Sequence, residues 1–230
     1  MNKELDSFQK TIGYTFNNIH LLENALTHSS YINENKERES EIEDNERLEF
    51  FGDAIIEFYV SEYLYLHHKD VPEGDLTRMR ASLVCEQSLA ECSRQINLGE
   101  YLRMGKGEEL SGGRDRASII SDAFEAVTAS IYLDSGRTAA EEFILENLIR
   151  KMEHRTIFYD AKTRLQEIVQ QSGSHLLKYE VISEDGPSHK KVFVTAVYLD
   201  DTEIGRGSGS SKKNAQQEAA MAAIKKITNR

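Results

Sequence analysis

The apolar residues in the first two thirds of the chain recur at intervals of three and four, which is the pattern of amphipathic helices. Pro72 and Gly74 interrupt this pattern, and a glycine-rich stretch at 104–118 interrupts it again. We therefore expect residues 1–155 to be almost entirely helical. The segments with the clearest helical pattern are 18–28, 45–67, 75–96, 118–135 and 138–155.

Beyond residue 160 the pattern becomes that of a mixed α and β module. A short helical segment at 163–173 is followed by three runs in which apolar and polar residues alternate, as they do in half-buried strands. Turn-forming pairs separate these runs, at Asp185–Gly186 and at Asp200–Asp201. An alanine-rich helix is expected at 211–227.

Together these patterns predict a multidomain protein of the α and α+β classes. An all-helical domain is expected at 1–155 and a short linker at 156–160, where the pattern changes. An α-β-β-β-α module is expected at 161–230. Both domains are within the usual size range of independently folding units.

The net charge of −11 is unevenly distributed along the chain. Residues 160–230 contain 11 Lys and Arg against 9 Asp and Glu, whereas residues 1–159 contain 17 against 30. The negative total, taken alone, argues against nucleic-acid binding, but the uneven distribution of charge weakens that objection. The acidic surplus of the first domain suggests that it requires a cation.

Three features indicate a cytoplasmic protein. No run of about 18 apolar residues is present, so no membrane-spanning helix and no membrane partner are expected. The N-terminal segment lacks the apolar core of a signal peptide. Cys85 and Cys92 are seven positions apart in a helical segment, and we expect them to be reduced thiols in the core.

A stripe of carboxylates runs along the segment NERLEFFGDAIIEF, residues 45–58. Glu46, Glu49 and Asp53 are three and four positions apart, so on a helix they share one face. Acids on one stripe repel each other unless a cation lies among them. Glu57 extends the stripe by one turn, and spacing alone does not decide whether it takes part. The residues expected to face the core instead are Leu48, Phe51, Ile55, Phe58 and Tyr59.

A second helical segment, 118–135, carries Asp122 and Glu125 three positions apart. Ala126 and Ala129 lie near that face, and small residues let two helices approach closely. The two acidic helices can therefore bring four carboxylates together, and such a set, with no Cys or suitably placed His, suits Mg²⁺ or Mn²⁺. Water bound to such an ion can act as a nucleophile on a phosphodiester.

Two alternative roles of these acids stay open from the residues alone. Acids at helical spacing most often form simply a solvated helix face. A di-iron carboxylate bundle would require Glu-x-x-His pairs, and neither acidic segment has a His at that offset.

Four motifs resemble those of the ribonuclease III family. The segment NERLEFFGDAIIEF resembles the family signature Glu-Arg-Leu-Glu-Phe-Leu-Gly-Asp. The motifs LTHSSY (26–31), PEGDLTRMRASLV (72–84) and SDAFEA (121–126) stand in the family's order and approximate spacing. The resemblance covers nearly the whole chain. It implies an all-helical endonuclease domain followed by a double-stranded-RNA-binding domain.

The resemblance implies a catalytic site of six acids that uses Mg²⁺, with Mn²⁺ able to substitute. Glu49, Asp122 and Glu125 would hold the metal directly, and Asp53 would do so directly or through water. The remaining two would shape a second metal environment or the position of the scissile bond, and whether one or two metals bind stays open. The six implied catalytic residues are Glu46, Glu49, Asp53, Glu73, Asp122 and Glu125.

The two adjacent phenylalanines of the signature segment receive different roles. Phe51 replaces the family's usual leucine and is expected to pack in the core. Phe50 lies beside the acidic stripe and away from the core face, and a large apolar side chain is seldom left in water. The resemblance implies that Phe50 enters a socket of a second subunit in a homodimer. Packing within its own subunit is the alternative.

The second module resembles a double-stranded-RNA-binding domain. Lys212 and Lys213 begin its last helix, where the helix dipole disfavours lysine but where a phosphate would be bound well. Gln216 stands where the family often has a third lysine, so we expect somewhat weaker phosphate binding. The further RNA contacts that the resemblance implies are Thr163, Gln166 and Glu167 in the first helix and Pro187, Ser188 and His189 in the first hairpin turn.

The resemblance implies an endoribonuclease that hydrolyses double-stranded RNA with Mg²⁺ and leaves 5′-phosphate and 3′-hydroxyl ends with short 3′ overhangs. It also implies roles in rRNA and mRNA processing. The expected partners are duplex RNA and a second copy of the chain, with no organic cofactor. The alternatives are a non-catalytic double-stranded-RNA-binding regulator and a carboxylate metalloenzyme that acts on small molecules, which would leave the second module without a role.

Overall fold

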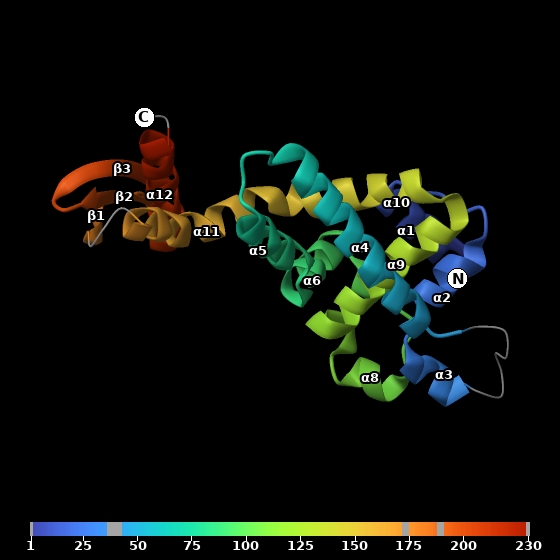
Figure 1. The fold of residues 1–230 in the computed structure, drawn as a ribbon. Coiled ribbons are helices and arrows are strands. Elements are labelled where there is room, and N and C mark those ends of the chain that lie inside the picture. The colour runs from blue at the N-terminus through green and yellow to red at the C-terminus, as the bar shows by residue number, and fades with distance from the viewer. Residues whose placement is uncertain (1, 36–42, 172–174, 188–190, 229–230) are drawn as a thin grey trace. The chain divides into compact units, whose positions relative to one another are not determined.

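The computed structural model describes residues 2–35, 43–171, 175–187 and 191–228. The chain divides into two compact units, Met1–Glu153 and His154–Arg230 (Figure 1). None of the described helices combines the length and the apolar character that a membrane crossing requires.

The first unit is helical, as the sequence pattern predicted. Its centre is α9, whose side chains are mostly buried because α2, α4, α6 and α10 pack around it (Figure 1). Short 3₁₀ and π-helical turns, η1 (Gly113–Asp115) and η2 (Leu145–Ile149), follow α8 and α10. The helices are α1 (Asn2–Ile12), α2 (Ile19–Ala25), α3 (Ser29–Asn35), α4 (Glu46–His67), α5 (Glu73–Val84), α6 (Glu86–Gln95), α7 (Leu98–Tyr101), α8 (Lys106–Leu110), α9 (Ala117–Ser135) and α10 (Arg137–Ile144).

The single helix expected at 75–96 is two helices, α5 and α6. Cys85 separates them with an extended backbone (φ −70°, ψ 153°). The hydroxyl of Ser88 donates to the carbonyl of Ser82 across the break and so stabilises the bend. Cys85 is exposed at this corner, so the expectation of a core thiol is wrong for it and correct for the buried Cys92. Both are free thiols.

The core face of α4 is narrower than predicted. Ile55 and Tyr59 are buried. Phe51 is partly buried and lies edge-on to Tyr132, with ring centroids 5.5 Å apart. Phe58, however, is 54% exposed, so placing it in the core was wrong. The guanidinium of Arg137, at the start of α10, lies over its ring instead, with Cζ 5.6 Å from the ring centroid.

The second unit is an α-β-β-β-α module. Its three strands form an antiparallel sheet in the order β1-β2-β3, and positive φ angles at Asp200 and Asp201 close the β2–β3 turn. The strand β3 and the helix α12 approach each other closely, because a Cβ atom at Gly207 would lie 2.2 Å from the main-chain nitrogen of Ala219. The elements are α11 (Arg150–Gln171), β1 (Leu177–Asp185), β2 (Val192–Leu199), β3 (Thr202–Gly209) and α12 (Lys212–Thr228).

The connection before this module is helical rather than irregular. α11 runs continuously from Arg150 to Gln171 and includes residues 156–160, which the sequence pattern suggested as a linker. The helix expected at 163–173 therefore begins earlier than predicted. No proline or glycine occurs between 150 and 171, so nothing in the local sequence interrupts the helix.

Candidate metal centre and RNA-binding surface

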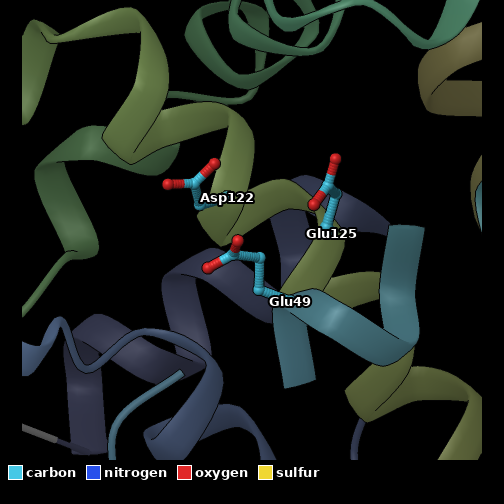
Figure 2. Close-up of side chains that lie close together, drawn as sticks. All are labelled: Glu49, Asp122 and Glu125. Atoms are coloured by element: carbon cyan, nitrogen blue, oxygen red, sulfur yellow. The ribbon is translucent and has the colours of Figure 1, made fainter. Parts of the chain in front are cut away.

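Three carboxylates from two helices converge in the first unit. Glu49 comes from the first turn of α4, and Asp122 and Glu125 come from α9 (Figure 2). One oxygen from each side chain lies within 4.8 Å of the others. All three side chains are partly buried, and each can offer a hard, anionic oxygen ligand. This donor set fits a divalent cation such as Mg²⁺ or Mn²⁺.

Gly52 makes this convergence possible. A Cβ atom at that position would lie 1.9 Å from the main-chain oxygen of Glu125, so no residue with a side chain fits while the helices keep this spacing. Ala126 and Ala129, from which the close approach was predicted, are indeed buried on α9. The role of Gly52 was not predicted. A glycine in a helix interior lowers helix stability by about 1 kcal/mol relative to alanine, so its presence in α4 was a signal of a packing role.

Burial disfavours the charged form of all three carboxyl groups in this cluster. Burial, followed by the charges of Asp53, Asp122 and Glu49, raises the pKa of Glu125 to about 8. Burial is also the first cause that raises the pKa of Glu49 and of Asp122. The upward shifts show that positive charge from the protein does not offset the burial of these groups. A bound cation would supply it.

This charge state predicts a pH dependence for the metal-free protein. Because the folded pKa of Glu125 is about 8 and its ordinary value is 4.5, the folded state keeps a proton that the unfolded state has already released. Stability should therefore fall as the pH rises from about 4.5 through about 8. Thermal unfolding in EDTA at about pH 5 to 9 should show a steeper decline for the wild type than for Glu125→Gln. Equal declines in both proteins would contradict the shifted pKa.

The remaining three predicted acids lie outside this compact group. Asp53 is exposed, but its charge raises the pKa of both Glu49 and Glu125, which places it nearby. Glu46 is exposed and raises the pKa of Glu49. Glu73 is the first residue of α5 rather than a turn residue, and its carboxylate accepts a hydrogen bond from Thr77. The structure therefore brings together three of the six in one compact group.

Two residues that were not predicted to belong to the site also act on it. The charge of Glu86 raises the pKa of Asp122, and the charge of His28 lowers it. Glu86 lies in the first turn of α6. The sequence pattern did not predict this helix start, because α5 and α6 were expected to be one helix. His28 forms a hydrogen bond with Ser30 through a ring nitrogen, at 2.8 Å.

Phe50 is an exposed aromatic residue beside the acids. Its side chain is 80% exposed, so the alternative that it packs within its own subunit is wrong. Phe51, the next residue, packs against the core as predicted. The two phenylalanines therefore differ in environment, as their places on the helix predicted.

The predicted phosphate site occupies the start of α12 in the second unit. Ser211 accepts a hydrogen bond from the main-chain nitrogen of Asn214 and so caps the helix. Lys212 and Lys213 follow in the first turn, and both are exposed. Lys212 lies 4.0 Å from Glu184, so part of its charge is compensated by the protein itself.

The further predicted RNA contacts lie on α11 and in the β1–β2 turn. Thr163 and Gln166 are exposed on one face of α11, and Glu167 is partly buried. Pro187 is exposed after Gly186, whose φ of 97° forms the turn. Ser188 and His189 lie outside the described residues.

Comparisons with known proteins agree with this arrangement. A ribonuclease-III-like family model matches residues 18–152, and a double-stranded RNA binding motif matches residues 161–227. Proteins named ribonuclease 3 from Caldanaerobacter subterraneus and Clostridium tetani are 48% and 47% identical. The alignments cover 97% and 99% of this chain, and 98% and 97% of theirs.

A solved structure supports the helical domain. A nuclease domain of ribonuclease III from Campylobacter jejuni is 37% identical and has a TM-score of 0.58. The similarity covers 64% of this chain and 96% of that one. With the two domain matches and the relatives along nearly the whole length, these findings show that the chain belongs to the ribonuclease III family.

Proposed function

We propose that this double-stranded-RNA endoribonuclease hydrolyses its substrate at a Mg²⁺ ion held by Glu49, Asp122 and Glu125. The observation that carries the proposal is the convergence of three carboxylate oxygens within 4.8 Å of one another. Oxygen ligands in a partly buried site match the preference of Mg²⁺, and Mn²⁺ shares that preference. When bound, the ion supplies an activated water and neutralises charge on the phosphate.

The protein's own contribution is to hold these ligands in place. Each comes from a helix, and the crossing at Gly52 sets the distance between the helices. We assign Asp53 to the same metal, directly or through water, because its charge raises the pKa of two of the ligands. Glu46 and Glu73 are proposed to act on the position of the scissile bond or on a second metal environment.

Cleavage by two such sites on opposite strands would leave 5′-phosphate and 3′-hydroxyl ends with short 3′ overhangs. Incubating long duplex RNA with the protein in Mg²⁺ should shorten it, and EDTA should stop the reaction. Sequencing of the fragment ends checks the overhang. Duplex binding without shortening in Mg²⁺ would instead indicate the non-catalytic regulator.

A second copy of the chain is the proposed partner of Phe50. An 80% exposed phenylalanine next to an acidic cluster is costly in water and suits a socket on another protein. The Campylobacter nuclease domain is described as flexible in a region involved in dimer formation. We therefore propose a homodimer in which Phe50 is an anchor.

Phe50→Ala should weaken this dimer. Loss of a buried aromatic anchor typically costs about 2 kcal/mol or more, which corresponds to a dissociation constant about 30-fold higher. Sedimentation velocity across a dilution series measures the change. Tyr65→Ala, at the exposed far end of α4, is the matched control and should leave the dimer intact. An unchanged dissociation constant for Phe50→Ala would refute the role.

The second unit is proposed to bind duplex RNA by shape. The start of α12 would bind backbone phosphate through Lys212, Lys213 and the helix N-terminus. The exposed polar face of α11 would contact a minor groove, and the β1–β2 turn would contact the next one. The assigned contacts are Thr163, Gln166, Glu167, Pro187, Ser188, His189, Lys212, Lys213 and Gln216.

Replacing both Lys212 and Lys213 with alanine tests this surface. Each lost phosphate contact should reduce the slope of log K against log salt concentration by roughly 0.9, and the affinity at low salt should fall. Filter binding of duplex RNA in EDTA, at several salt concentrations, measures both. A slope equal to that of the wild type would count against the surface.

We place this activity in the cytoplasm, on the duplex regions of rRNA and mRNA. The free thiols of Cys85 and Cys92 are consistent with a reducing compartment.

A further inference from the structure

Lys162 carries an ammonium group that is held between α11, α12 and β1. Its Nζ atom donates to Oε1 of Gln216 at 2.8 Å and lies 4.6 Å from the centroid of the Tyr179 ring. Its main-chain nitrogen donates to Oε1 of Gln217 at 3.0 Å. All four residues belong to the second unit, so the arrangement is fixed within one compact body.

The partners of Lys162 leave its charge uncompensated. An amide oxygen and an aromatic face orient a cation without neutralising it. Among the described residues no carboxylate forms an ion pair with Lys162, whereas Lys212 lies 4.0 Å from Glu184. An ammonium has three donors, and the bond to Gln216 uses one of them. The lysine can therefore donate to a further acceptor.

The position of this cation relates it to the phosphate site. Gln216 lies three and four residues after Lys213 and Lys212, so on α12 the three side chains share a face. Because Gln216 accepts from Lys162, it draws the ammonium toward that face. Along α11, Lys162 is followed directly by the exposed Thr163. Lys162, a residue of α11, thus reaches α12 with its ammonium group, and both helices are proposed to contact RNA.

We propose that Lys162 binds a backbone phosphate of the duplex RNA and that Gln216 positions its ammonium group for this contact. At this point of the surface α11 then supplies the cation, Lys162, and α12 supplies the neutral side chain that orients it, Gln216. Ordering a lysine before binding lowers the entropy that is lost on binding. The inference rests on the proposed RNA-binding surface of the second unit.

Lys162→Met is the first test, because methionine keeps an apolar stem against Tyr179 and removes the charge. In the full-length protein, in EDTA, duplex affinity should fall several-fold and the salt slope should decrease by roughly 0.9. Lys162→Arg should restore the slope. Lys225→Met, which replaces an exposed lysine in the last turn of α12, is the matched control and should bind as the wild type does. A wild-type slope for Lys162→Met would overturn the phosphate contact.

A purely structural role is separated by the same measurements. If Lys162 only stabilised the module, Lys162→Met would lower the melting temperature and leave the salt slope unchanged, which overturns the proposal. Gln216→Met tests the positioning role. It should keep the salt slope and lower affinity more in the wild-type background than in Lys162→Met, where only its own contact with RNA is lost. Equal losses in both backgrounds would overturn the assignment of Gln216 as the side chain that orients Lys162.

The failure of this inference is distinguishable from failure of the RNA-binding surface as a whole. A reduced slope for the Lys212→Ala and Lys213→Ala double variant, with an unchanged slope for Lys162→Met, refutes Lys162 alone. Unchanged slopes in both refute the proposed surface together with the inference.

Discussion

Glu125→Gln is expected to slow cleavage of duplex RNA in Mg²⁺ by about a thousandfold, which corresponds to about 4 kcal/mol of transition-state stabilisation. Glutamine has nearly the same shape, but it removes one anionic ligand from a set of three whose oxygens lie within 4.8 Å. Duplex affinity should change little, because the proposed RNA contacts of the second unit are untouched. Gel-based single-turnover cleavage and filter binding measure the two effects separately.

The matched control is Glu142→Gln, which makes the same substitution at an exposed position of α10. It should cleave at the wild-type rate. Wild-type cleavage by Glu125→Gln would refute the assignment of this residue as a metal ligand. A loss of duplex binding in parallel with cleavage would instead show that the substitution damages substrate binding.

Gly52→Ala is expected to have the second largest effect. The added Cβ would meet the main-chain oxygen and carbon of Glu125 at 1.9 and 2.4 Å, and backbone atoms cannot rotate away. α4 and α9 must therefore separate, at a cost of about 1–3 kcal/mol in the free energy of unfolding. Because the separation moves Glu49 away from Glu125, cleavage should also fall, by about a hundredfold for a displacement near 1 Å.

Gly107→Ala provides the comparison, since a Cβ at that helical glycine of α8 would meet nothing within 4 Å. It should be neutral or slightly stabilising. Urea unfolding gives the stability of both variants. Cleavage should be assayed at a temperature where Gly52→Ala remains folded. Wild-type stability and wild-type cleavage in Gly52→Ala would contradict the close crossing.

The sequence predicted most of the helical architecture because its strongest signals are local. The periodicity of α4 and α9 was visible, and so were the acids at three- and four-residue spacing. The β2–β3 turn followed from two aspartates, which tolerate the positive φ angles observed there. The shared faces of these helices followed from the geometry of a helix alone.

What the sequence could not show depends on contacts between distant segments. The break at Cys85 carries no glycine or proline, so its helical pattern continues across the bend. Phe58 has core-like spacing on α4, yet it is exposed because that part of the helix faces outward beside Arg137. The role of Gly52 can be recognised only when the backbone segment that lies opposite it is known. From the sequence, Gln216 was interpreted as the loss of a lysine that the family often has. Only the structure shows that Lys162 donates a hydrogen bond to it.

The assignment on which most of these expectations depend is that Glu49, Asp122 and Glu125 bind the divalent ion used for cleavage. A crystal of the protein soaked in Mn²⁺ tests it directly, because anomalous scattering locates the ion. We expect a peak among the three carboxylates, at roughly 2.0–2.3 Å from their oxygens, that is lost in Glu125→Gln. A Mn²⁺-active protein whose only ordered Mn²⁺ lies away from these three residues would contradict the assignment.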